Sequence, residues 1–152
     1  ESGVVLDFAE IKAAARDVLA ELDHRYLNDL PFFAAHNLRN FRGKCESLHG
    51  HNWKVEAVIT GRDLDESGVV LDFAEIKAAA RDVLAELDHR YLNDLPFFAT
   101  HNPSSENIAR YLFHRLAERL NDQRVKVSRV SAWESEDACA TYLSDDDPSS
   151  SG

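Results

Sequence analysis

Three histidines near one another in the sequence have the residue type and spacing of a metal site. His49 and His51 are two residues apart, so on a β-strand both side chains leave the same face. His36 lies thirteen residues before His49 and can reach that face from a neighbouring strand. Three neutral imidazoles without a fourth protein ligand are typical of a catalytic zinc, whose open position takes water or substrate. The sequence therefore predicts zinc bound by His36, His49 and His51.

Cys45 lies four residues before the His pair and allows two interpretations. Beside an open zinc site, the cation would lower the pKa of the thiol and make it a reactive thiolate. Alternatively, Cys45 is the fourth ligand of a closed structural site. In the first case Cys45→Ala keeps the metal, and in the second it loses the metal.

Asp88 and His89 form a second candidate group, at the end of a predicted helix. An adjacent carboxylate can orient an imidazole and raise its basicity, although an isolated pair of this kind is more often a charge pair at a helix end. The same pair occurs earlier as Asp23 and His24.

Three other residues of reactive type are predicted to have ordinary roles. His101 has no His-x-His partner and is not expected to bind metal. His114 lies in the middle of a predicted helix. Cys139 has no nearby His or Cys and is expected in the core.

The composition is that of one globular domain. The chain has 152 residues, of which 44% are hydrophobic and 29% are charged. Two cysteines argue against a disulfide framework, and we see neither an 18-residue apolar run nor a signal-peptide pattern, so we expect a cytoplasmic protein.

The net charge of -10 argues against nucleic acid or an anionic membrane as a partner. A phosphorylated substrate would need a locally basic pocket. Arg39, Arg42 and Lys44 lie beside the predicted metal loop and are the candidates to bind phosphate; the alternative is that they are solvated loop charges.

A long internal repeat divides the chain. Residues 1–34 are identical to residues 66–99. Natural repeats diverge in sequence, so we interpret this identity as a recent or engineered tandem duplication. The copy ends where a first strand should lead to His36. Because Asn28, Asp29 and Pro31 disfavour strand, we expect a shortened first strand over residues 32–38.

Hydrophobic spacing predicts an α+β fold. Apolar residues recur at helical spacing over residues 73–87 and 105–120, with Asp72 and Ser104 as N-caps, and again over residues 8–22 in the copy. Strands are predicted over residues 54–60, 125–134 and 138–143. The predicted organisation is a duplicated segment (1–34), one domain (35–143) and a disordered tail (144–152).

Five motifs in one order carry a resemblance that covers about residues 34–143. They are His36-Asn37-Leu38 with Gly43-Lys44-Cys45 and His49-Gly50-His51-Asn52-Trp53, then Val70-Leu71-Asp72-Phe73, Leu87 to Asn93, Asn102 to Asn107, and Trp133-Glu134. The sequence resembles the 6-pyruvoyltetrahydropterin synthase / 6-carboxytetrahydropterin synthase family. The resemblance implies a T-fold: a ββααββ unit with an antiparallel sheet and two helices on one face. An extra N-terminal helix would come from the copy. In the family such sheets join into an oligomeric barrel, which implies a trimer or hexamer.

The resemblance also implies a function. It implies a zinc-dependent lyase acting on 7,8-dihydroneopterin triphosphate, with Cys45, Asp88 and His89 moving protons and the Asp-His pair supplied by a neighbouring subunit. It implies that Glu134 anchors the pterin ring, with help from Glu106. Without the family, Glu134 would be interpreted as a surface charge on a strand, and Glu106 as a charge in the first turn of a helix.

Three outcomes remain open within the resemblance. The short chain and tight Cys-x-x-x-His-Gly-His loop are more similar to the bacterial 6-carboxytetrahydropterin synthases of queuosine biosynthesis than to the pyruvoyl branch, which leads to tetrahydrobiopterin. The second possibility is that pyruvoyl branch. A third is a zinc-binding oligomer without turnover, because the N-terminus is rearranged.

Overall fold

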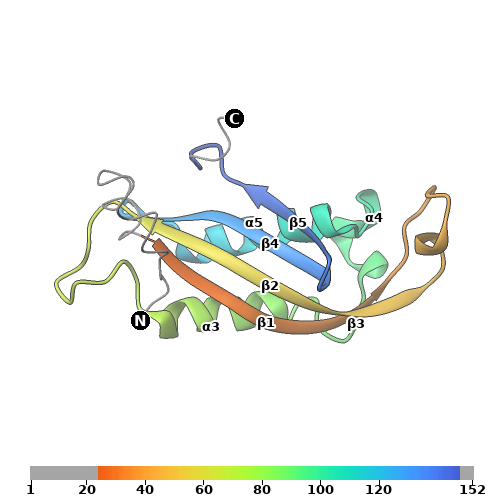
Figure 1. Ribbon diagram of the computed structural model, residues 1–152, viewed down its shortest axis with the longest axis horizontal. Helices are drawn as coiled ribbons and strands as arrows, with labels where there is room; N and C mark the ends of the chain where they lie inside the picture. Colours follow the sequence, from red (N-terminus) through yellow and green to blue (C-terminus); the bar gives the residue numbers. More distant parts are fainter. Residues whose placement is uncertain (1–23, 148–152) are drawn as a thin grey trace.

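The computed structural model describes residues 24–147 (Figure 1). Along the chain the elements are β1 (His24–His36), the 3-10 helix η1 (Lys44–Glu46), β2 (His49–Gly61), α3 (Phe73–Leu84), β3 (Arg90–Tyr91), the 3-10 helix η2 (Leu92–Asp94), α4 (Pro96–Thr100), α5 (Ser105–Leu120), β4 (Val125–Ser135) and β5 (Ala138–Leu143). The predicted helix over residues 8–22 lies outside the described residues.

The strands form one sheet in the order β3-β1-β2-β4-β5. The four long strands are antiparallel, whereas the two-residue β3 pairs parallel with Ala34 and Ala35 of β1. The predicted α+β class is therefore confirmed. The short elements β3, η2 and α4 are additions that hydrophobic spacing did not indicate.

Helices α3 and α5 cover one face of the sheet, and the core lies between these layers (Figure 1). The buried face of α3 carries Ile76, Ala80 and Val83. Its N-cap is Asp72, as predicted, and the carboxylate accepts the N–H of Ala74 at 2.8 Å. The helix ends at Leu84, three residues before the predicted end, and the chain then turns toward β3.

Helix α5 has the bounds that the sequence predicts. The Ser104 side chain caps its N-terminus by accepting the N–H of Asn107 at 3.3 Å. Strands β4 and β5 also match their predicted positions to within one residue. These elements have strong apolar periodicity, and their sequence occurs only once in the chain.

The predicted shortening of the first strand is wrong. β1 extends over thirteen residues and pairs with β2 along its length, with a register shift between Leu27 and Leu30. The ring of Phe32 stacks on that of Trp53, with centroids 5.9 Å apart. Asn28 and Asp29 lie at this register shift and have no partner in β2, so the pairing on either side of them carries the strand through two weak strand formers. Pro31 is tolerated because β1 lies near the edge of the sheet.

Both predicted boundaries of the domain, after residue 34 and after residue 143, fall next to or within ordered parts of the structure. The boundary predicted between residues 34 and 35 falls within β1, so the end of the copied sequence is part of the sheet. At the other end, the N–H of Ser144 donates to the carbonyl of Ser128 at 2.8 Å, and Asp147 is buried against the Ser128 hydroxyl. Residues 148–152 of the predicted tail lie outside the described part.

Within residues 24–147 no helix is long and apolar enough to cross a bilayer.

Candidate functional site

The three predicted metal ligands meet at one end of β1 and β2. His36 pairs with His49 across the two strands, and His51 follows two residues later on the same face. This face is the one that carries Phe32 and Trp53 into the core. One nitrogen from each imidazole lies within 4.8 Å of the others. The structure therefore brings these three side chains together, as their spacing predicts.

Backbone carbonyls fix the tautomers of two of these rings. Nδ1 of His36 lies 2.6 Å from the carbonyl oxygen of Pro103, and Nδ1 of His49 lies 2.6 Å from that of Ser47. A carbonyl only accepts, so each Nδ1 carries the proton and each Nε2 presents a lone pair. This second-sphere arrangement is the usual one for histidines that bind a metal.

Burial keeps two of the rings neutral. Desolvation lowers the pKa of His36 despite its hydrogen bond to Pro103, and desolvation also lowers the pKa of His51 despite the nearby Glu134 carboxylate. Nε2 of His36 and Nε2 of His51 are buried without a hydrogen-bond partner. The Glu134 carboxylate lies 3.6 Å from Nε2 of His51, which is too long for a hydrogen bond.

This donor set fits a zinc ion. Tetrahedral nitrogen ligands at the usual Zn–N distance are about 3.3 Å apart, so small ring rotations would bring the three atoms into range. Nε2 of His36, whose proton is on Nδ1, and Nε2 of His51 are buried nitrogens without partners, and a cation bound by their lone pairs would satisfy both. Among the described residues, Cys45 is not part of this group. The geometry thus favours the open site over a closed one with four protein ligands.

A cavity of about 470 Å³ adjoins His36. Its volume is typical of small-molecule sites. Four of the predicted site residues line it: His36, Cys45, Glu106 and Glu134. The other lining residues are Leu38, Phe41, Asn102, Ser104, Ser105 and Asn107. We refer to this cavity as the His36 pocket.

Cys45 and Glu134 reach this pocket from different elements. Cys45 is half-buried in η1, where its carbonyl accepts the N–H of Leu38 at 2.7 Å. Gly43 precedes η1 with a φ of 137°, a conformation that favours glycine. Glu134 lies at a register shift near the end of β4, and the hydroxyl of Ser105 lies 3.5 Å from its carboxylate.

Asp88 and His89 do not reach the His36 pocket of their own chain. They lie beside β1, where the Asp88 carboxylate accepts the N–H of Phe33 at 2.8 Å and lies 3.0 Å from Nδ1 of His89. The hydrogen bond from Phe33, followed by the interaction with His89, lowers the pKa of Asp88. The His89 side chain is 77% exposed.

The predicted basic cluster is divided by the fold. One terminal nitrogen of the Arg39 guanidinium donates to the carbonyls of Phe98 at 2.6 Å and His101 at 3.1 Å, so this side chain is engaged within the chain. Arg42 and Lys44 are exposed and do not line the pocket. Nothing in the sequence indicated that Arg39 would bind backbone carbonyls, or that Pro103 would hold His36.

The remaining predicted residues have separate places. His24 begins β1 opposite Thr60, far from the metal end of the strand, and Asp23 lies outside the described residues. His101 is bonded to the carbonyl of Phe97 at 3.0 Å. The prediction that Cys139 is in the core is wrong, because β5 exposes it. Its face of the edge strand points away from the helices.

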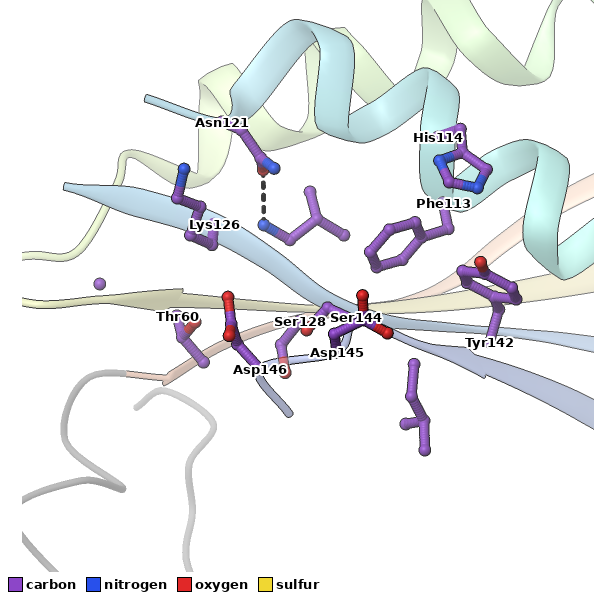
Figure 2. A pocket seen from close by; sticks show the side chains of 13 residues that line it. Thr60, Phe113, His114, Asn121, Lys126, Ser128, Tyr142, Ser144, Asp145 and Asp146 are labelled. Carbon is purple, nitrogen blue, oxygen red and sulfur yellow. Dashed lines mark hydrogen bonds between the residues drawn. The ribbon is translucent and has the colours of Figure 1, made fainter. Parts of the chain in front are cut away.

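A second cavity lies away from His36, His49 and His51, between α5, the start of β4 and the end of β5 (Figure 2). Its volume is about 510 Å³, and His114, Lys126 and Tyr142 are among the residues that line it. None of the predicted catalytic, substrate-binding or metal residues contributes to it. The larger volume is therefore not what identifies the candidate site.

Known proteins show the same fold and related sequences. The profile of the family described as 6-pyruvoyl tetrahydropterin synthase matches residues 31–145, and it also matches residues 1–35 separately. The structure of 6-pyruvoyl tetrahydropterin synthase from Caenorhabditis elegans superposes with a TM-score of 0.71 at 30% identity, covering 80% of this chain and 94% of that one.

Two archaeal relatives have different names. An Archaeoglobus fulgidus protein, provisionally named 6-carboxy-5,6,7,8-tetrahydropterin synthase, is 42% identical over 98 residues, which are 64% of this chain and 80% of the relative. A Pyrococcus furiosus protein named dihydroneopterin monophosphate aldolase is 38% identical over 103 residues, covering 68% and 82% of the two chains. The fold, the histidine geometry and these matches agree: the chain belongs to the 6-pyruvoyl tetrahydropterin synthase family.

Proposed function

We propose that this chain is a 6-carboxytetrahydropterin synthase. In this reaction 7,8-dihydroneopterin triphosphate and water give 6-carboxy-5,6,7,8-tetrahydropterin, acetaldehyde and triphosphate, a step toward queuosine. The observation that carries the proposal is the group of three histidines, of which His36 lines a pocket together with Cys45 and Glu134. Relatives named for this activity support the carboxy branch.

His36, His49 and His51 are the residues that would hold zinc. Bound there, zinc would act as a Lewis acid on the side-chain oxygens of the substrate and make the adjacent C–H bonds more acidic. The carbonyls of Pro103 and Ser47 orient two of the rings for this role. The lowered pKa values of His36 and His51 keep their lone pairs available at neutral pH.

Glu134 is the proposed anchor of the pterin ring. A carboxylate can accept two parallel hydrogen bonds from an aminopyrimidinone edge, as it does from a guanidinium. Because Glu134 lies 3.6 Å from Nε2 of His51, a ring held by this carboxylate would have its side chain within reach of the histidines. Glu106, at the first turn of α5, lines the same pocket and helps to hold the ring.

Cys45 is the proposed acid-base group on the substrate side chain, and it lines the pocket together with His36. Asp88 and His89 complete the proton transfer in our proposal. Because both lie outside the pocket of their own chain, a second copy must supply them, and we propose a homo-oligomer with shared sites. Lys44 is the exposed first residue of η1 and is proposed to bind phosphate at the pocket mouth.

The test is metal content and product identity measured on one purified sample. Both the triphosphate and the monophosphate of dihydroneopterin are offered, because one relative is named for a monophosphate substrate. We expect bound zinc, and 6-carboxytetrahydropterin with acetaldehyde from the triphosphate. Cys45→Ala should keep zinc and lose turnover, whereas His49→Ala should lose both.

Each other outcome has a definite meaning. A pyruvoyl product would assign the chain to the second candidate, 6-pyruvoyltetrahydropterin synthase, which the Caenorhabditis elegans structure favours by its name. Zinc without any product would identify a metal-binding oligomer without turnover. A protein that binds no zinc would overturn the proposal.

A further inference from the structure

The loop between β1 and β2 carries Cys45 to the pocket but has little structure of its own. This segment, residues 37–48, is called the Cys45 loop here, and its only regular element is the three-residue η1. Most of its side chains are exposed. Within the loop, the N–H of Leu38 bonds the Cys45 carbonyl and the Asn37 side chain bonds the Glu46 carbonyl. Side chains from outside the loop add further contacts, which come from residues 91–102.

Asn102 bonds the backbone of this loop in both directions. Its side-chain oxygen accepts the N–H of Arg39 at 2.9 Å, and its side-chain nitrogen donates to the Arg39 carbonyl at 2.9 Å. The guanidinium of Arg39 adds bonds to the carbonyls of Phe98 and His101. One amide side chain thus acts as a strand partner for Arg39, and the Arg39 side chain reinforces the same contact.

The backbone beside Asn102 holds the other walls of the pocket. The Asn102 carbonyl accepts the N–H of Ser104 at 2.8 Å and the side-chain amide of Asn107 at 2.9 Å, which ties it to the start of α5. The next carbonyl, that of Pro103, accepts Nδ1 of His36. Asn102 therefore lies where the Cys45 loop, the start of α5 and a metal-side histidine are joined.

We propose that Asn102 is a positioning residue that, with Arg39, sets Cys45 relative to His36 and the substrate. The inference rests on the proposed function for its catalytic part, since Cys45 has the acid-base role there. Its structural part concerns only the order of the loop. Asn102 lines the pocket, but both atoms of its side-chain amide are bonded to the Arg39 backbone, so we assign it no part in the chemistry.

The test compares Asn102→Ala with Asn121→Ala, both in a Cys139→Ser background so that Cys45 is the only thiol. Asn121 is a matched control, because its side-chain oxygen also accepts a backbone N–H, that of Val127 at 2.7 Å, but in the second cavity (Figure 2). The measurement is the rate at which a neutral maleimide modifies Cys45 in metal-free protein. We expect Asn102→Ala to raise this rate roughly 5- to 30-fold and Asn121→Ala to leave it unchanged.

Turnover gives the second measurement. We expect Asn102→Ala to lower kcat about 100-fold with a much smaller change in KM, because a misplaced acid-base group affects the bound substrate. Arg39→Lys keeps the charge and the Asn102 contacts but removes the planar guanidinium. It should therefore raise the modification rate of Cys45 and lower kcat, each by less than Asn102→Ala does. This variant also tests the inference if Asn102→Ala does not fold.

Two results would overturn the inference: equal modification rates for the Asn102→Ala and Asn121→Ala proteins, or equal kcat values for them where the parent protein turns over. If the parent has no turnover but the modification rates differ as expected, the proposed function fails while the role of Asn102 in ordering the loop stands. The two ideas are therefore separable.

Discussion

Residues 24–34 and 89–99 have identical sequences and different structures. The first copy forms most of strand β1, while the second forms β3, η2 and α4. The first residue shows the difference: His24 is in the strand, whereas His89 has a φ of 57°. Eleven identical residues have identical propensities, so the surroundings decide. The first copy leads into the β1–β2 ladder, and the second follows the turn after α3.

The same difference reverses which aromatic side chain is buried. In the strand, Phe32 is buried and Phe33 is 44% exposed, because neighbouring residues point to opposite faces. In the second copy, the residue equivalent to Phe33 is Phe98, which is fully buried. Burial of a side chain is thus a property of its place in the fold and not of its local sequence.

The largest expected effect separates two histidines just beyond the identical stretch. His36 and His101 occupy equivalent positions of the repeat, but only His36 lies with His49 and His51. We expect His36→Ala to lower zinc affinity by at least roughly 100-fold, more than loss of an outer-sphere partner does, and His101→Ala to leave it unchanged. Competition with a chromophoric chelator measures both. Equal affinities in the two variants would contradict the metal assignment.

The next effect concerns the equivalent phenylalanines. Phe98→Ala should lower the free energy of unfolding by about 3–5 kcal/mol, because it empties a buried site. Phe33→Ala removes a side chain that is 44% exposed, and a change within about 1 kcal/mol is expected. Urea unfolding followed by tryptophan fluorescence compares the two. A larger loss for Phe33→Ala would mean that β1 does not have the described register.

A smaller, pH-dependent effect is expected from Asp88, which bonds the N–H of Phe33 across the two copies. The pKa of Asp88 is lower in the folded protein than its ordinary value of 3.8. Its contribution to stability is therefore present above about that pH and is lost as the pH falls through the folded pKa. Asp88→Asn should lower the urea midpoint at pH 7, and the difference from the parent should disappear in acid. A difference that stays constant with pH would exclude the ionised carboxylate as its cause.

The smallest expected effects are the changes in stability on replacing the equivalent prolines, Pro31 and Pro96, and these changes have opposite signs. Pro31 lies within strand β1, whereas Pro96 begins α4. Replacing Pro31 with Val should stabilise the protein by up to about 1 kcal/mol, since Val favours strands. Pro96→Val should destabilise it by less than about 1 kcal/mol, because proline suits the first turn of a helix. Thermal unfolding of both variants provides the comparison, and the same sign in both would contradict it.

The predictability of each part follows from the same physics. Helix α5 and strands β4 and β5 were predictable because their apolar periodicity agrees with their place in the fold. The full length of β1 was not, because its propensity is weak and pairing with β2 supplies the free energy. Likewise, the end of α3 at Leu84 depends on a turn that places Asp88 beside Phe33, a contact between residues far apart in sequence.

The candidate site divides in a similar way. The approach of His36, His49 and His51 follows from strand periodicity, so spacing alone predicts it. The prediction that Glu134 and Glu106 belong to the same site came from the family resemblance and not from spacing. The separation of Asp88 and His89 from that pocket is set by the path of the chain around β1, which no local pattern reveals.

The proline within β1 also limits how the sheet can grow. Within residues 24–147, the outer side of β1 is paired with another strand only at Ala34 and Ala35. Exposed strand edges are templates for aggregation, and proteins protect them with prolines and register irregularities. Pro31 lacks an N–H, and the irregularity between Leu27 and Leu30 interrupts the alternation just before it. A sequence that begins helix α4 in one copy thus acts as a gatekeeper against uncontrolled strand addition in the other.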